Sequence, residues 1–103
     1  MRFVELPRFA REFRKLSPEA RRRFIESFRE FDAACDELLR EPNGFEWPSL
    51  LRVEKLVGQR GIYAFTWSFA RPDGRTTFEF MTIDGQPAVV LRRIGRHDIY
   101  KEP

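Results

Sequence analysis

At 103 residues the chain is long enough for one small domain with a modest core, so we treat residues 1–103 as a single domain. The net charge of +3 and the pI of about 9.5 rest almost entirely on arginine, whose planar fork suits phosphate and favours an anionic partner. The single cysteine, Cys35, excludes an intrachain disulfide, and no stretch is long and apolar enough for a signal peptide or a membrane span, so we expect a cytoplasmic protein without membrane contact.

The first half of the chain predicts two amphipathic helices after a short extended start at residues 2–6. Pro7 can open the first helix, because its missing N–H is not needed in the first turn. Ser17 is a good N-cap for a second helix that runs to about Arg40. One apolar stripe recurs along both helices at three- and four-residue spacing, formed by Phe9, Phe13, Leu16, Phe24, Phe28, Phe31, Cys35 and Leu38. The tight junction between the helices predicts a helix hairpin.

The second half predicts four strands, which follow a loop at residues 41–49. The strands are expected at residues 51–57, 62–69, 75–83 and 88–94, with turns between them at residues 58–61, 72–74 and 84–85. We therefore predict an α+β domain, in which the N-terminal helix hairpin packs on one face of a mostly antiparallel four- to five-stranded sheet. The other face is expected to stay open and to carry polar side chains.

Alternation along the strands predicts which side chains reach each face of the sheet. The core side is expected to hold Tyr63, Phe65, Trp67, Phe69, Phe78 and Phe80. The open face is expected to hold Arg52, Glu54, Ala64, Thr66, Ser68, Arg75, Thr77, Glu79 and Arg92. At the edge of this positive band lies a closing cluster of Arg93, Arg96, His97 and Tyr100, which has no evident use in a purely structural strand end.

Such a set of side chains suits the cleavage of RNA without a metal. The reaction needs a base to take the proton of a ribose 2′-OH, an acid to protonate the leaving 5′-oxygen, and cations at the scissile phosphate. The only histidine, His97, suits either proton role near neutral pH, and Tyr100 can contact phosphate or stack on a base. Glu54 and Asp73 are available as proton partners. The substrate-binding cations are expected to be Arg52, Lys55, Arg92, Arg93 and Arg96.

Each of these residues also has a purely structural interpretation. A single histidine in a charged segment is often a solvated surface residue, and an aspartate between Pro72 and Gly74 is a common turn residue. Cys35 lies on the apolar stripe and suits the core. One histidine and one distant cysteine cannot make a usual zinc site, so we expect neither a metal nor another cofactor.

Four segments in a fixed order carry a further signal. They are residues 51–58 with a Lys-Leu-x-Gly step, the aromatic strand from residue 61, the hairpin at residues 72–78, and residues 92–100 with a closing Gly-x-His motif. In this order and spacing, over nearly the whole chain, they resemble the RelE/ParE superfamily of bacterial toxin–antitoxin toxins. The resemblance implies a toxin that cleaves mRNA, typically on the ribosome, and that a cognate antitoxin neutralises in a hetero-oligomer.

The resemblance also implies roles for single residues. Arg75 looks like the arginine that contacts the scissile phosphate, and His97 looks like the acid or base of the YoeB- and YafQ-like branches. Tyr100 resembles the aromatic residue that ends the closing motif. Asp73 resembles a YafQ-like aspartate.

The chain also departs from the family pattern. Ala64 and Thr66 stand where the RelE branch carries two lysines. The general-base glutamate of the YoeB-like branch has no clean counterpart, with Ser49 nearest and Glu46 close by. Two alternatives to an endoribonuclease therefore stay open at this point. One is a ParE-like poison of DNA gyrase, and the other is a catalytically silent binding scaffold of the same fold.

Overall fold

The chain forms a five-stranded sheet with two α-helices, which confirms the α+β prediction. The structure is a computed structural model that describes residues 1–70 and 72–103. Its elements are β1 (Arg2–Glu5), α1 (Pro7–Arg14), α2 (Pro18–Arg40), β2 (Glu54–Lys55), β3 (Ile62–Ser68), β4 (Gly74–Ile83) and β5 (Gln86–Gly95). Two short 3-10 helices, η1 (Ser49–Leu51) and η2 (His97–Lys101), complete the chain.

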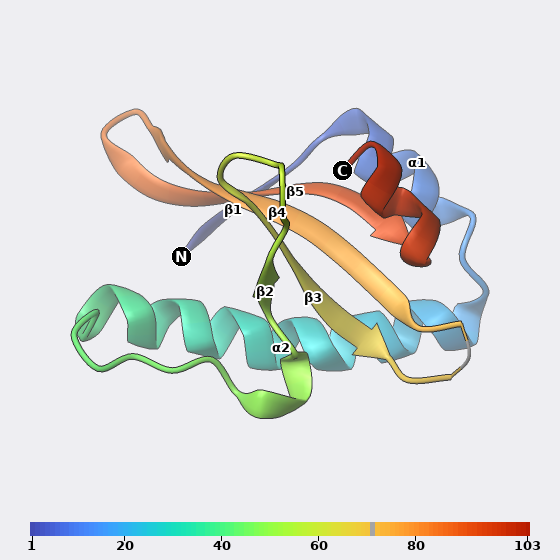
Figure 1. Ribbon diagram of the computed structural model, residues 1–103, viewed down its shortest axis with the longest axis horizontal. Coiled ribbons are helices and arrows are strands. Elements are labelled where there is room, and N and C mark those ends of the chain that lie inside the picture. Colours follow the sequence, from blue (N-terminus) through green and yellow to red (C-terminus); the bar gives the residue numbers. More distant parts are fainter. Residues whose placement is uncertain (71) are drawn as a thin grey trace.

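The strand order in the sheet is β1-β5-β4-β3-β2. β1 pairs with β5 in parallel, and the three other pairs are antiparallel. Figure 1 shows α2 running along one side of the sheet, while η2 follows the end of β5, and the Arg8 side chain of α1 reaches Glu102 just after η2. The C-terminal segment is thus brought next to the N-terminal helix.

α2 follows its sequence signals closely. Ser17 caps the helix by accepting a hydrogen bond of 3.1 Å from the backbone N–H of Ala20, and Pro18 takes the first helical position. The apolar stripe faces the sheet, where Phe24, Phe31 and other stripe residues are buried. In the part of the chain that the structure describes, no helix is both long and apolar enough to cross a membrane.

Aromatic rings form the centre of the core between α2 and the sheet. Phe31 is fully buried, and its ring lies 4.5 Å from that of Phe65 and 4.8 Å from that of Phe78, centroid to centroid. The Trp47 ring stacks on Phe31 from the loop before β2, at 5.5 Å. Such contacts bury large apolar areas and add specific ring–ring attraction.

The expected strand at residues 51–57 is only partly correct. η1 occupies its beginning, and only Glu54 and Lys55 pair with β3. The strand is interrupted at Arg52, the residue that ends η1. Its backbone is left-handed, with a φ of 46°, and a β-strand cannot continue through this conformation. Arg52 therefore lies outside the sheet, contrary to its expected place on the open face.

Two further expectations about the sheet faces need correction. Phe69 is expected on the core side but is 52% exposed, since β3 ends at Ser68. Phe80 lies on the core side as expected, with its ring stacked on Trp47, although it is 38% exposed. The open face is also less open than expected. Thr77 is fully buried and donates a hydrogen bond to an oxygen of Pro103, so the C-terminal segment covers this part of the face.

The burial of Ser68 has a separate cause. The pairing of β3 with β4 shifts register between Thr66 and Ser68. A shift of one residue changes the face to which a side chain points. The Ser68 hydroxyl consequently accepts a hydrogen bond from Arg23 of α2 at 3.4 Å, so it belongs to the helix side and not to the open face.

A second irregularity lies in β5. Thr77 pairs with Arg93 and Phe78 pairs with Leu91, so Arg92 is an extra residue without an opposite partner. Such a bulge bends the strand and re-aims its side chains. Leu91 remains in the core, while the side chains of both Arg92 and Arg93 lie on the open face.

We predict that Phe31→Ala lowers the free energy of unfolding by roughly 3–5 kcal/mol, because it opens a cavity among rings that cannot close it fully. Urea denaturation measures the loss. Leu39→Ala, at a 47% exposed position of the same helix, is the matched control and is expected to change stability by about 1 kcal/mol or less. Equal losses in the two variants would contradict the central position of Phe31.

Candidate active site

A buried arginine organises the polar cluster at the start of β4. The Arg75 side chain is only 10% exposed, and its guanidinium donates to Glu54 at 3.5 Å, to Asp73 at 3.3 Å and to the Tyr100 hydroxyl at 3.1 Å. A buried charge needs such partners, since removing it from water without them is costly. The cluster thus joins β2, the β3–β4 turn, β4 and η2.

Strand pairing explains why these residues meet. Glu54 pairs with Ala64, which pairs with Thr77, and Thr66 pairs with Arg75, so all of them share one face of the sheet. Gly74 lets the chain enter β4 close to the indole of Trp67. A Cβ atom on Gly74 would lie 2.6 Å from a ring carbon of Trp67, so only glycine fits here without a shift.

Tyr100 links the arginine to the carboxylate. Its hydroxyl accepts from Arg75 and donates to Glu54, each at 3.1 Å. Burial raises the pKa of the Tyr100 phenol from 10.0 to about 12, the positive charge of Arg75 opposes this shift, and the hydrogen bond to Glu54 adds to it. The phenol therefore stays protonated at neutral pH and serves as a fixed donor to Glu54.

His97 lies at the edge of this cluster. It begins η2, and its ring packs against that of Tyr100 with centroids 4.8 Å apart. The side chain is exposed and makes no hydrogen bond to any other described residue. The structure thus brings together all four residues that the sequence nominated as catalytic, which are Asp73, Arg75, His97 and Tyr100.

The arginines of β5 are paired with acids. Arg93 binds the carboxylate of Glu12 from α1 through two nitrogens, and this contact raises the pKa of the Arg93 guanidinium above its ordinary value. Arg92 lies 3.3 Å from Glu79 and donates to an oxygen of Pro103 at 3.1 Å. Their side chains retain 15% and 29% exposure, so they line a surface without being free cations.

The three other residues that the sequence predicts to bind the substrate do not lie together. Arg96 donates to the backbone oxygen of Pro72 at 2.5 Å and lies over the Trp67 ring, so it secures the turn before Arg75. Arg52 lies over the ring of Phe69 at 5.9 Å and makes no contact with the Arg75 cluster among the described residues. Lys55 is exposed beside Glu54.

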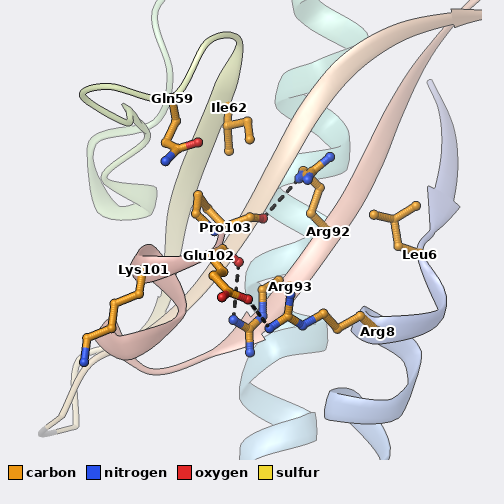
Figure 2. A pocket seen from close by; sticks show the side chains of 9 residues that line it. All are labelled: Leu6, Arg8, Gln59, Ile62, Arg92, Arg93, Lys101, Glu102 and Pro103. Carbon is orange, nitrogen blue, oxygen red and sulfur yellow. Dashed lines mark hydrogen bonds and ion pairs between the residues drawn. The ribbon is translucent and has the colours of Figure 1, made fainter.

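Two adjoining cavities lie beside the cluster. The first, of about 310 Å³, is lined by Glu54, Lys55, Leu56, Val57, Gln59 and Tyr100. The second, of about 400 Å³, is lined by Leu6, Arg8, Gln59, Ile62, Arg92, Arg93, Lys101, Glu102 and Pro103 (Figure 2). Gln59 lines both cavities, and we refer to the two cavities together as the groove.

The groove suits acid–base chemistry on an anion and offers no evident metal site. Across residues 1–70 and 72–103, no three histidine, cysteine or acidic side chains are placed to hold a metal ion. Cys35 is buried in the core, and burial raises the pKa of its thiol to about 12, which makes it inert.

Sequence reasoning undervalued two glutamates. Glu54 was named only as an available proton partner, yet it is the carboxylate that Tyr100 and Arg75 both contact. The available signal was its position two residues after Arg52, which places it on the same open face of the predicted strand. Glu12 was missed, because its contact with Arg93 joins residues 81 positions apart and no local pattern reports it.

Comparison with known proteins bears on the fold alone. The sequence matches no known protein-family profile and no curated protein. A free-state variant of the E. coli toxin RelE superposes with a TM-score of 0.57 over 98% of this chain and 90% of that chain, at 19% identity. The chain has the fold of RelE. Isolated E. coli RelE (TM-score 0.54, 21% identity, 98% of this chain and 92% of that chain) agrees.

A third solved structure with the RelE fold is the intact E. coli RelBE toxin–antitoxin complex. Its matching chain has a TM-score of 0.54 and 18% identity, over 92% of this chain and 94% of that chain. The fold is therefore shared along nearly the full length of both proteins, while the side chains that fill it differ at about four positions in five.

We predict that the Tyr100 phenol ionises near pH 12 in the folded protein, because burial disfavours the phenolate. Its folded pKa exceeds the unfolded value, so the stability it contributes is fully present below pH 10.0 and is lost as pH rises through about 12. Phenolate absorbance of the wild type minus that of Tyr100→Phe isolates this group. Ionisation at its ordinary value would contradict the hydrogen-bonded, half-buried position.

Proposed function

We propose that the chain is the toxin of a toxin–antitoxin system and cleaves mRNA as a metal-independent endoribonuclease. The observation that carries the proposal is the hydrogen-bonded series from Arg75 through Tyr100 to Glu54, at one end of a groove lined by further arginines. The RelE fold supports it, since E. coli RelE is a toxin. Together the residues offer a cation for phosphate, a fixed phenol and a carboxylate that is half exposed.

In the proposed reaction Glu54 is the base. Its carboxylate takes the proton of the ribose 2′-OH, and the 2′-oxygen attacks the adjacent phosphorus. The bond to the 5′-oxygen breaks, and His97, in its protonated form, gives that oxygen a proton. The products are a 2′,3′-cyclic phosphate and a 5′-hydroxyl. A positioned acid or base of this kind contributes about 10²–10⁴-fold to a rate.

Arg75 and Tyr100 support these two proton transfers. The Arg75 guanidinium stabilises the charge that builds on the phosphoryl oxygens, a contribution commonly worth about 10²–10³-fold. Tyr100 orients the Glu54 carboxylate, and its ring can stack on a nucleobase of the RNA.

We further propose that Lys55, Arg92 and Arg93 bind the RNA backbone along the groove. Arg52 and Arg96, which contact Phe69 and Pro72, have lesser roles in this proposal. The substrate is proposed to be mRNA on the ribosome, in the cytoplasm. A cognate antitoxin is the proposed protein partner, because E. coli RelE occurs in the RelBE toxin–antitoxin complex.

A catalytically silent binder with this fold is the second candidate. The specific observation in its favour is that Arg75 is already engaged by Glu54, Asp73 and Tyr100 and is only 10% exposed. A phosphate must replace one of these partners before Arg75 can act. A binder would keep the cluster closed and would leave RNA intact.

We predict that Glu54→Gln lowers RNA cleavage by about 10²–10⁴-fold, since it removes the base while keeping the shape of the side chain. His97→Ala and Arg75→Ala are expected to relieve growth arrest as well. Primer extension on mRNA after induced expression measures cleavage. Glu26→Gln, at an exposed position of α2, is the control for charge and is expected to cleave like the wild type.

Each outcome of this experiment has a separate meaning. Undiminished cleavage by Glu54→Gln, in a protein that unfolds like the wild type in urea, would reject Glu54 as the base. Intact mRNA with the wild type, together with tight antitoxin binding, would favour the silent binder. DNA breaks that depend on gyrase, without cleaved transcripts, would replace the nuclease proposal by gyrase poisoning.

A further inference from the structure

The C-terminal residues Glu102 and Pro103 lie among three arginines of the groove. Arg8 donates to the Glu102 carboxylate at 3.4 Å, and Arg93 donates to the Glu102 backbone oxygen at 3.3 Å. Arg92 donates to an oxygen of Pro103 at 3.1 Å. Figure 2 shows these side chains converging on residues 102–103, while the Lys101 ammonium points away from them.

Two of the three arginines are held in place by acids from other parts of the fold. Arg8 comes from α1, and the bulge in β5 presents Arg92 and Arg93 together. Glu79 pairs with Arg92 and Glu12 pairs with Arg93, so Glu102 is the acid that offsets Arg8. Among the described residues, the ion pair of Arg8 is therefore supplied by Glu102 near the C-terminal end.

The groups that occupy this site are all oxygens that accept hydrogen bonds. A carboxylate and two backbone oxygens meet donors from arginine, and the Thr77 hydroxyl adds a fourth donor at 3.1 Å. Phosphodiester oxygens have the same acceptor chemistry and share the same single negative charge as a carboxylate, and the arginine fork suits them well. The Glu102 side chain is 76% exposed, so its ion pair is readily exchanged with a solvated anion.

We propose that Arg8, Arg92 and Arg93 form a binding site for a backbone phosphate of the RNA that flanks the scissile one, and that residues 102–103 occupy this site until RNA displaces them. The inference rests on the proposed function for its ligand class. The shared wall at Gln59 places the site next to the Glu54 and Tyr100 cavity, as a neighbouring nucleotide requires. The tail is then an internal competitor that weakens RNA binding.

Binding of a short single-stranded RNA tests the inference without any cleavage. All ribose 2′-hydroxyls of this RNA are methylated, so no 2′-oxygen can attack. Glu102→Gln removes the competing charge and is expected to bind several-fold more tightly than the wild type. Arg8→Gln is expected to bind several-fold more weakly, and its log–log salt slope is expected to fall by about 0.7, the value for one phosphate contact on a single strand.

Matched controls are available on the same molecule. Glu19→Gln breaks an exposed ion pair with Arg23, and Arg2→Gln breaks an exposed pair with Asp84, and both pairs lie outside the groove. If Glu102→Gln binds like Glu19→Gln, or Arg8→Gln binds like Arg2→Gln, the inference is overturned. It is also overturned if no variant binds the RNA.

Failure of the proposed function gives a different pattern. A wild type that leaves unmodified RNA intact, with Glu102→Gln still binding more tightly than its control, rejects the nuclease and supports the phosphate site. A wild type that cleaves RNA, with no difference between the variants and their controls, keeps the nuclease and rejects the site.

Discussion

The buried charge of Arg75 is the constraint on which the rest of this end of the molecule depends. A guanidinium that is only 10% exposed must be surrounded by acceptors, and the fold supplies them from three separate segments. The pairing of β2 with β3 brings Glu54 to Arg75, and the turn before β4 brings Asp73 there. Tyr100 reaches Arg75 because η2 folds back over the sheet. The same contacts that hold the two terminal nitrogens of Arg75 therefore assemble the candidate active site, so stability and chemistry share one cluster.

The bulge in β5 has a comparable effect on the surface beside that cluster. With strict alternation, Arg92 and Arg93 would point to opposite faces. The extra residue lets Leu91 stay in the core while both arginines reach the groove, where Arg93 meets α1 and Arg92 meets Glu79 and the tail. The groove thus combines paired cations with the carboxylate of Glu102, and under the proposed function this arrangement keeps the site weakly charged until a polyanion binds.

Much of this arrangement follows from local sequence signals, and the rest does not. Ser17 and Pro18 fix the start of α2, and the spacing of Phe24 and Phe31 fixes its buried side. The grouping of Arg75, His97 and Tyr100 also follows, because alternation and motif order place them at one end of the sheet. The left-handed Arg52 and the register shift before Ser68 are local breaks in alternation that moved a side chain from its expected face. The bulge at Arg92 is a third break, which leaves Arg92 on the open face as expected and brings Arg93 to the same face. The contact between Glu12 and Arg93 depends on packing between distant segments, which periodicity does not encode.

The central claim is that Glu54, Arg75, Tyr100 and His97 cleave RNA by attack of the ribose 2′-oxygen. The chemical nature of the new RNA ends tests it most directly, with purified protein and mRNA both free and bound to ribosomes. The account predicts a 2′,3′-cyclic phosphate on one fragment and a 5′-hydroxyl on the other. Fragments with a 3′-hydroxyl and a 5′-phosphate, or RNA that stays intact in both settings, would contradict it.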